Sequence, residues 1–229
     1  IISFLISFFW AFLSQGWFVE RPHIFSLLCM SAYLLILSRP LTTRTALAFP
    51  LVMILWANLH GGFLLGVILL GCVLLENLGA RQRIRPLVAA FLLTCLAALC
   101  TPYHVRLLPF ILSHTWQARA LDISMEFRPL SSPGLYLILL LMLLSLSYYL
   151  RPKIQWLITV GVFGAIAILS QRFIPFFYTI TSPLVGDIIA ILVSSSPHSI
   201  RKFTKRLPFL PFSSSILLAL IIVLWSLQD

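Results

Sequence analysis

The sequence predicts an all-α fold, a polytopic transmembrane helix bundle with about 8–9 membrane segments. Three observations lead to this prediction. The chain is 60% hydrophobic and only 10% charged, whereas about a quarter of the residues in a soluble domain are charged. Apolar runs of about 15 residues or more recur along the chain, separated by short basic pieces. These runs do not alternate apolar and polar residues, as the strands of a membrane β-barrel would.

The apolar segments are short for membrane helices. Several contain fewer than the roughly 20 residues that a perpendicular span needs, which is typical of broken or tilted helices around a cavity. The chain begins within an apolar run at Ile1, so we expect it to be the C-terminal portion of a longer protein. We expect residues 1–229 to form one domain. The nine predicted segments are 1–18, 22–38, 45–58, 61–78, 87–101, 133–150, 154–170, 173–193 and 213–227.

The basic residues lie mainly between the predicted spans. In a soluble protein, a net charge of +10 would suggest nucleic acid binding. Here the positive-inside rule accounts for the charge, because Lys and Arg concentrate in cytoplasmic loops. We therefore predict no nucleic acid partner. We expect the basic loops, Arg201–Arg206 above all, to contact anionic phospholipid.

The stretch Leu55–Gly66, LWANLHGGFLLG, predicts a chain reversal. A reversal at 58–62 places the basic residues that precede it and those that follow residue 78 on the same face. Applied to the whole chain, it puts 11 basic residues on the inner face and 5 on the outer face, which accounts for all 16. One long helix over 45–78 would break this segregation. No long internal repeat is evident.

Asn58 and His60 are the first candidate substrate-binding residues. Gly61 and Gly62 allow a tight turn and close approach of a ligand, so the turn could present an amide and an imidazole at the outer face. The alternative is a break in helix packing, with His60 bonded to a neighbouring carbonyl group.

Two arginines on the predicted outer face are further candidates. Arg172 lies between two apolar runs, where a charge is costly unless it is paired or reaches water. Its planar guanidinium suits phosphate oxygens, although it could instead extend to the membrane interface. Glu20 and Arg21 could line a polar cavity or simply cap the following helix. These assignments rest on residue type and position alone.

The longest outer loop, 102–132, supplies the remaining candidates. Residues 105–116 have the pattern of a helix that lies in the membrane interface, and His104 precedes them. Asp122 and Glu126 are four residues apart. On a helix they would share a face and could bind a divalent cation or act as base and helper. The alternative is a solvated loop paired with nearby arginines.

Four pieces of the chain together resemble a known group. They are RPHIFSLL at 21–28, LWANLHGGFLLG at 55–66, TPYHVRLLPFIL at 101–112 and SQRFIPFF at 170–177. Their order and spacing resemble bacterial polytopic proteins related to the GT-C glycosyltransferases, a superfamily that includes protein mannosyltransferases. The resemblance covers most of residues 20–190.

The resemblance implies a multi-pass protein of the bacterial inner membrane that uses a polyprenyl-phosphate-linked sugar on the extracytoplasmic face. We expect an inverting glycosyltransferase, in which a divalent cation could serve as a cofactor. Its substrate-binding residues would be Asn58, His60, His104, Arg21 and Arg172. Its catalytic acid or base would come from Asp122, Glu126 or Glu20. A transporter or flippase for an amphiphilic anion, and a catalytically inactive membrane scaffold, are the alternatives.

Overall fold

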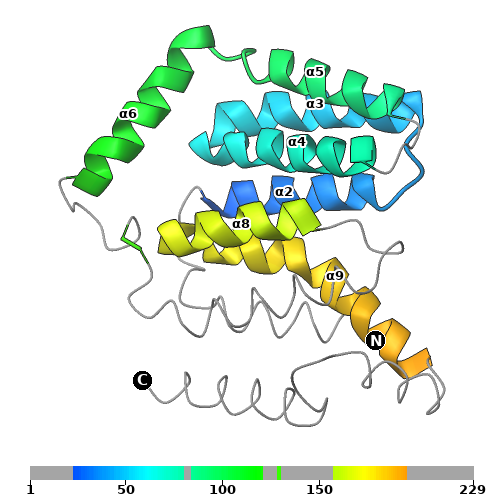
Figure 1. Ribbon diagram of the computed structural model, residues 1–229. Helices are drawn as coiled ribbons and strands as arrows, with labels where there is room; N and C mark the ends of the chain where they lie inside the picture. The colour runs from blue at the N-terminus through cyan, green and yellow to red at the C-terminus, as the bar shows by residue number, and fades with distance from the viewer. Residues whose placement is uncertain (1–22, 80–83, 121–127, 130–156, 195–229) are drawn as a thin grey trace.

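The computed structural model describes residues 23–79, 84–120, 128–129 and 157–194, and all of its regular structure is helical. Seven α-helices lie within the described part of the chain (Figure 1). The predicted segments 1–18, 133–150 and 213–227 lie outside the described residues. The seven helices are α2 (His23–Leu37), α3 (Thr43–Leu59), α4 (Leu64–Gly79), α5 (Arg85–Ala97), α6 (Leu107–Ala120), α8 (Leu157–Leu169) and α9 (Ile174–Ser194).

Six of these helices form a closed ring. Around the ring, α2 packs against α3, α3 against α5, α5 against α4, α4 against α8, α8 against α9 and α9 against α2. Fully buried aromatic side chains fill the interior, with Tyr33 edge-on to both Phe49 and Trp56 at ring-centroid distances of 5.0 and 5.6 Å. Edge-to-face packing of this kind is a favourable geometry for aromatic pairs. The ring therefore has its own core.

The predicted reversal in 55–66 is confirmed. Helix α3 ends at Leu59, His60 adopts an extended conformation (φ −160°, ψ 140°), and the short 3₁₀ helix η2 (Gly61–Phe63) leads into α4. Helices α3 and α4 consequently run antiparallel (Figure 1). Arg39, Arg44 and Arg85 lie at the same end of the ring as a result.

A second reversal repeats this geometry. Helix α8 ends at Leu169, Ser170 is extended (φ −154°, ψ 122°), and η5 (Gln171–Phe173) leads into α9. In both reversals the extended residue donates to the carbonyl four positions back, and the Phe three positions later donates to the extended residue. The sequence indicated no repeat, because the two turns share little beyond Phe63 and Phe173. We call the end of the ring that carries both turns the reversal end.

Helix α6 stands apart from the ring. It follows η3 (His104–Arg106) and runs obliquely across the reversal end (Figure 1). Leu107, Leu108 and Ile111 pack against the ring, while Phe110 and Leu112 are exposed. The predicted helix over 105–116 is thus present. It carries apolar residues both on the face that packs against the ring and on the exposed face.

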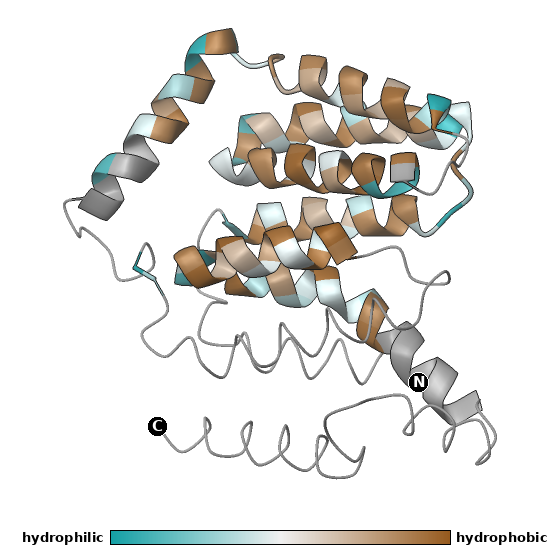
Figure 2. Ribbon diagram, in the orientation of Figure 1, coloured by the Kyte–Doolittle hydropathy of each residue, from teal (hydrophilic) through white to brown (hydrophobic). Residues whose placement is uncertain are grey.

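The surface of the ring is apolar along its length (Figure 2). Leucines of five of its helices, α2, α3, α4, α5 and α8, are exposed, among them Leu51 (65%), Leu55 (64%) and Leu96 (62%). In the described part of the chain, one helical stretch, Gly61–Leu78, is long and apolar enough to cross a bilayer, and five further apolar helices are shorter. The described residues therefore do not show the predicted 8–9 membrane segments.

Candidate functional site

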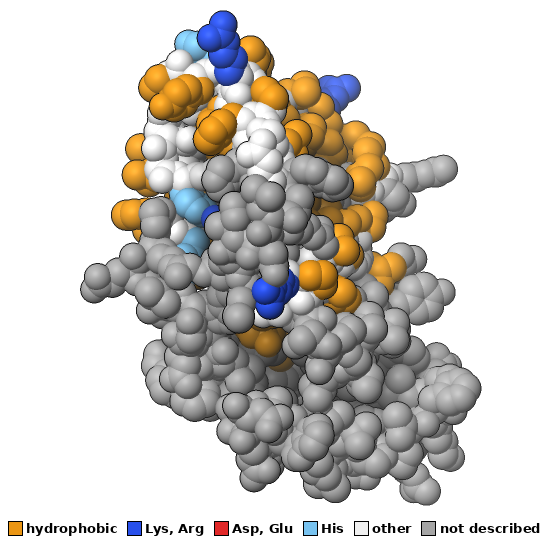
Figure 3. Space-filling model, turned by 90° about the vertical axis from the view of Figure 1, so that its left-hand side faces the viewer, with side chains coloured by type: hydrophobic (Ala, Val, Ile, Leu, Met, Phe, Trp, Pro, Cys, Tyr) orange, Lys and Arg blue, Asp and Glu red, His pale blue; other side chains and the backbone are white. Residues whose placement is uncertain are grey.

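His60 and Arg172 meet at the reversal end. They are 112 residues apart in the chain, and Arg172 Nη2 lies 3.1 Å from His60 Nε2. His60 lies in the turn between α3 and η2, and Arg172 lies in η5, the equivalent turn between α8 and α9. Both side chains are half-buried. Figure 3 shows His side chains beside a basic side chain on this face. The two turns thus bring together two of the predicted substrate-binding residues.

Buried polar groups hold the His60 ring from behind. Ser26 Oγ lies 2.6 Å from His60 Nδ1 and accepts a hydrogen bond from Trp56 Nε1 at 2.7 Å. The backbone N–H of Gly62 also points at Nδ1, at 3.1 Å. Ser26 and Trp56 are fully buried. Ser26 and Gly62 hold Nδ1 from fixed positions, so the ring presents Nε2 toward Arg172.

Gly62 is required for this arrangement. A Cβ atom at position 62 would lie 2.5 Å from Ser26 Oγ and 2.9 Å from His60 Nδ1. Only a residue without a side chain lets the backbone approach the ring this closely. Gly61 is different, because its Cβ would meet only the Ile111 side chain at 3.7 Å. Of the two glycines, Gly62 is therefore the one whose lack of a side chain the site requires.

The surroundings keep the imidazole neutral. Burial, the Arg172 guanidinium and the nearby His23 lower the pKa of His60 from 6.5 to about 4. Desolvation and a neighbouring positive charge both disfavour the imidazolium form. At neutral pH the site consequently carries the Arg172 charge beside an uncharged ring that can donate or accept.

Asn58 lies at the predicted turn, in the last turn of α3. Its amide nitrogen donates to Ile54 O at 2.8 Å and to Cys100 O at 2.9 Å. These bonds tie the end of α3 to the segment that follows α5. Its role in substrate binding remains a prediction, and its amide nitrogen serves to anchor the chain.

His104 lies in a strained conformation on the other connection at this end. Its φ is 46°, in the left-handed region, which is uncommon for a residue other than Gly. Its Nδ1 is 3.2 Å from Leu99 O. Since a carbonyl oxygen can only accept, Nδ1 is the donor in this contact. No contact joins His104 to His60 or Arg172 among the described interactions.

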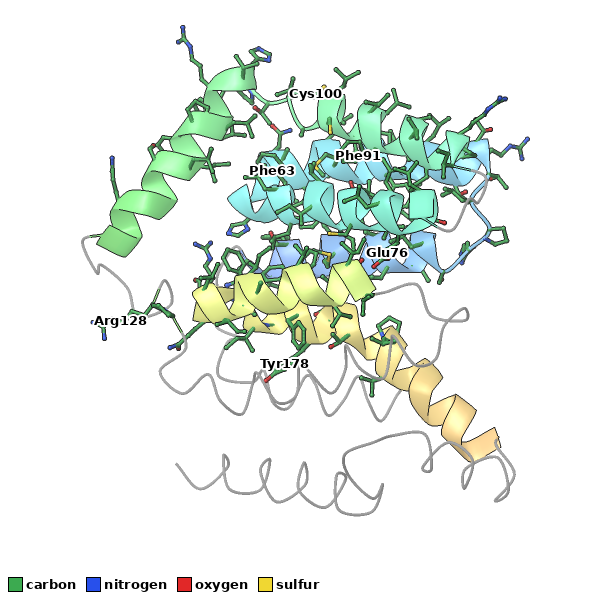
Figure 4. All side chains as sticks on the ribbon, in the orientation of Figure 1. Phe63, Glu76, Phe91, Cys100, Arg128 and Tyr178 are labelled. Atoms are coloured by element: carbon green, nitrogen blue, oxygen red, sulfur yellow. The ribbon has the colours of Figure 1, made fainter. Side chains whose placement is uncertain are left out.

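The other predicted site residues lie outside the described residues. Glu20 and Arg21 precede His23, and Asp122 and Glu126 fall in the segment 121–127. Within the described part, no group of three His, Cys, Asp or Glu side chains could hold a metal ion. Backbone groups nearby reach the site, because Gln171 N donates to Arg128 O at 3.1 Å. Figure 4 shows Arg128 at the left of the ring and Glu76 at its opposite end.

Sequence reasoning missed Ser26 and Trp56. Ser26 is a small polar residue within the apolar run of α2, and Trp56 precedes His60 by one helical turn. Residues four apart share a helix face, so this spacing could have placed Trp56 on the same side of the chain as His60. It could not have indicated Ser26, which comes from a separate helix.

The fold and the site define a class only in general terms: a helical bundle with an imidazole–guanidinium pair at one end. Comparison of the chain with protein-family models, with curated proteins and with solved structures found no match in any of the three.

Proposed function

We propose that this protein is an integral membrane glycosyltransferase that binds the phosphate of a polyprenyl-phosphate-linked sugar at His60 and Arg172. The contact between His60 Nε2 and Arg172 Nη2 at 3.1 Å carries the proposal. It places a positive charge and a ring nitrogen at one point, where a phosphate oxygen could accept from both. The resemblance of residues 20–190 to GT-C-related proteins supplies the reaction.

The apolar surface supports placement in the membrane. Contiguous exposed apolar patches are unusual on soluble monomers and mark interaction with membranes or partners. The leucines exposed on α2, α3 and α5 would face lipid tails, and the described helices would account for part of the 8–9 proposed membrane segments. The reversal end would then face the extracytoplasmic side, because Arg39, Arg44 and Arg85 are at the other end.

In this proposal Arg172 stabilises the leaving group. A base removes the proton of the acceptor hydroxyl, and the resulting oxygen attacks the anomeric carbon from the face opposite the phosphate. The bond between the anomeric carbon and the phosphate oxygen breaks, and the lipid phosphate leaves with its electrons. Arg172 neutralises the growing negative charge, which is the usual role of a fixed cation at a departing oxyanion. Glu20, Asp122 or Glu126 would be the base, and a divalent cation could assist the carboxylates.

The test is sugar transfer in membranes that contain the full-length protein. We expect labelled sugar to move from a panel of polyprenyl-phosphate sugars to an acceptor with the wild type. Arg172→Ala should reduce transfer at least about 100-fold, in line with the loss of a group that stabilises transition-state charge. His60→Ala should reduce it similarly. Arg106→Ala is the matched control, because Arg106 is an exposed arginine of η3 at the same end.

Two outcomes would contradict the proposal. One is unchanged transfer in both site variants. The other is movement of lipid-linked sugar across vesicle membranes without any transfer, which would favour a transporter of an amphiphilic anion.

A further inference from the structure

Two groups that can only donate hydrogen bonds face the His60 ring on opposite sides. The Gly62 backbone N–H points at Nδ1 at 3.1 Å, and Arg172 Nη2 lies 3.1 Å from Nε2. Neither an amide N–H nor a guanidinium can accept a hydrogen bond. A neutral imidazole has one nitrogen with a lone pair and one with a proton. With no ligand present, one of the two donors must therefore face a ring N–H.

Ser26, the third neighbour of the ring, can form a hydrogen bond with Nδ1 whether or not that nitrogen carries the proton. Ser26 Oγ accepts from Trp56 Nε1 and lies 2.6 Å from His60 Nδ1. A hydroxyl both donates and accepts, so Ser26 can either donate to an unprotonated Nδ1 or accept from a protonated one. Gly62 and Arg172 therefore determine which ring nitrogen carries the proton.

Arg172 has the advantage in the empty site. A hydrogen bond from a charged donor is roughly twice as strong as one between neutral groups. The ligand-free ring should therefore leave Nε2 unprotonated for Arg172 and carry its proton on Nδ1. The amide of Gly62 then loses its partner, because its position is set by the turn and the glycine cannot move away.

We propose that an anionic oxygen bound between His60 and Arg172 moves the imidazole proton from Nδ1 to Nε2. The proton leaves Nδ1 and another reaches Nε2 by exchange with water, so the ring stays neutral. In the bound state Nε2–H and the Arg172 N–H both donate to the ligand oxygen, while Gly62 N–H and the Ser26 hydroxyl donate to Nδ1. Every donor around the ring then has an acceptor. Gly62, Ser26 and Trp56 act as positioning residues.

This inference rests on the proposed function for its ligand class, and it adds a rule of specificity. A ligand must bring a hydrogen-bond acceptor to complete the arrangement, so phosphate oxygens fit and an ammonium group does not. The energetic gain of binding includes the hydrogen bond that Gly62 recovers, since an unpaired donor that is partly shielded from water is costly.

The first test reads the tautomer directly. The full chain, with its histidines labelled with ¹⁵N, is studied by NMR in a non-ionic detergent at pH 7, and His60 signals are assigned by their absence in His60→Gln. We expect Nδ1 to be the protonated nitrogen before ligand and Nε2 to be the protonated nitrogen at saturating inorganic phosphate. A ring that remains protonated on Nδ1 with phosphate bound, or that becomes doubly protonated, would overturn the inference.

The second test needs no ligand. Arg172→Met removes the donor opposite Nε2, so the ligand-free ring should shift to the Nε2–H form and accept from Gly62. Arg172→Lys keeps a charged donor and should retain the Nδ1–H form of the wild type. If the His60 ring in Arg172→Met is still protonated on Nδ1, Gly62 does not control the tautomer and the inference is wrong. If this test succeeds while phosphate changes no signal, the proposed function fails and the tautomer control does not.

Discussion

His60 is the residue on which the reversal end depends, because four groups from three parts of the chain contact its two nitrogens directly or through Ser26. Trp56 and Gly62 are its neighbours in sequence, Ser26 comes from α2 and Arg172 from η5. Such a network constrains each member sterically and by donor–acceptor matching. Substitutions here should have effects that differ sharply between adjacent positions.

Gly62→Ala and Gly61→Ala provide such a pair. The Cβ at position 62 would overlap Ser26 Oγ at 2.5 Å, so we expect Gly62→Ala to destabilise the protein by about 1–3 kcal/mol. Gly61→Ala places its Cβ 3.7 Å from Ile111, an ordinary contact, and should change stability by less than about 1 kcal/mol. Thermal unfolding in detergent measures both. Equal effects of the two changes would contradict the close approach at Gly62.

The stability of the protein should also depend on pH through His60. Its pKa is lowered to about 4 in the folded protein by burial, Arg172 and His23, whereas the unfolded side chain titrates near 6.5. As the pH falls from 6.5 to 4, the unfolded state binds a proton before the folded state does, so stability is lost across this window. Below pH 4 both states are protonated and the loss stops.

The measurement is the melting temperature of the wild type and of His60→Gln between pH 7 and pH 4. We expect the wild type to lose more stability on acidification, because Gln does not titrate. Parallel curves for the two proteins would show that another group accounts for the acid sensitivity.

At the scale of elements, contacts between helices satisfy the helix ends. The N–H of Thr159, in the first turn of α8, donates to Glu76 Oε1 of α4 at 2.9 Å. The first N–H groups of a helix have no partner within the helix, so Glu76 caps α8 from another helix. Asn58 performs a similar task at the other end, since its amide bonds Cys100 O.

Glu76→Ala should therefore destabilise the docking of α8. We expect a loss of about 1–2 kcal/mol, the usual effect of removing a helix N-cap. Glu76→Gln keeps an oxygen that can accept from Thr159 and should lose less. Chemical unfolding followed by circular dichroism compares the two variants, and an equal loss in both would show that the charge, and not the hydrogen bond, is what matters.

At the scale of the whole molecule, the two reversals decide which loops share a side. The turns at His60 and Ser170 lie at one end, together with Cys100, while Arg39, Arg44 and Arg85 lie at the other. If the ring spans a membrane, these two sets of residues must face opposite compartments. Cys100 is exposed, whereas Cys29 and Cys72 are buried, so a native thiol already marks the reversal end.

We predict that Cys100 reacts with a membrane-impermeant thiol reagent from the extracytoplasmic side in intact cells. Cys100→Ser identifies the signal. In that background, Arg39→Cys should react only after the membrane is opened. Reaction of both positions from the same side would refute a membrane-spanning ring.

The sequence predicted much of the fold. Segment boundaries agree within a few residues for α2, α3, α4 and α8, because apolar runs and Gly or Pro punctuation mark helix ends. The interruption at Asn58–Gly62 was readable as a reversal from the distribution of Arg residues. Pro175 is the second residue of α9, where its missing N–H removes no hydrogen bond within the helix. Pro183 does lie inside α9, and the second half of that helix diverges from the first (Figure 1).

The sequence by itself determined a helical, apolar chain that turns back at His60, because hydropathy and charge are properties of local composition. It also identified His60 and Arg172 as candidates from their residue types. Only the tertiary structure decided that they touch, since their contact joins turns 112 residues apart. It likewise decided that Ser26 and Gly62 hold the ring, while Asn58 anchors the chain. Such partners depend on how the helices close into a ring, and that packing is not encoded in any single segment.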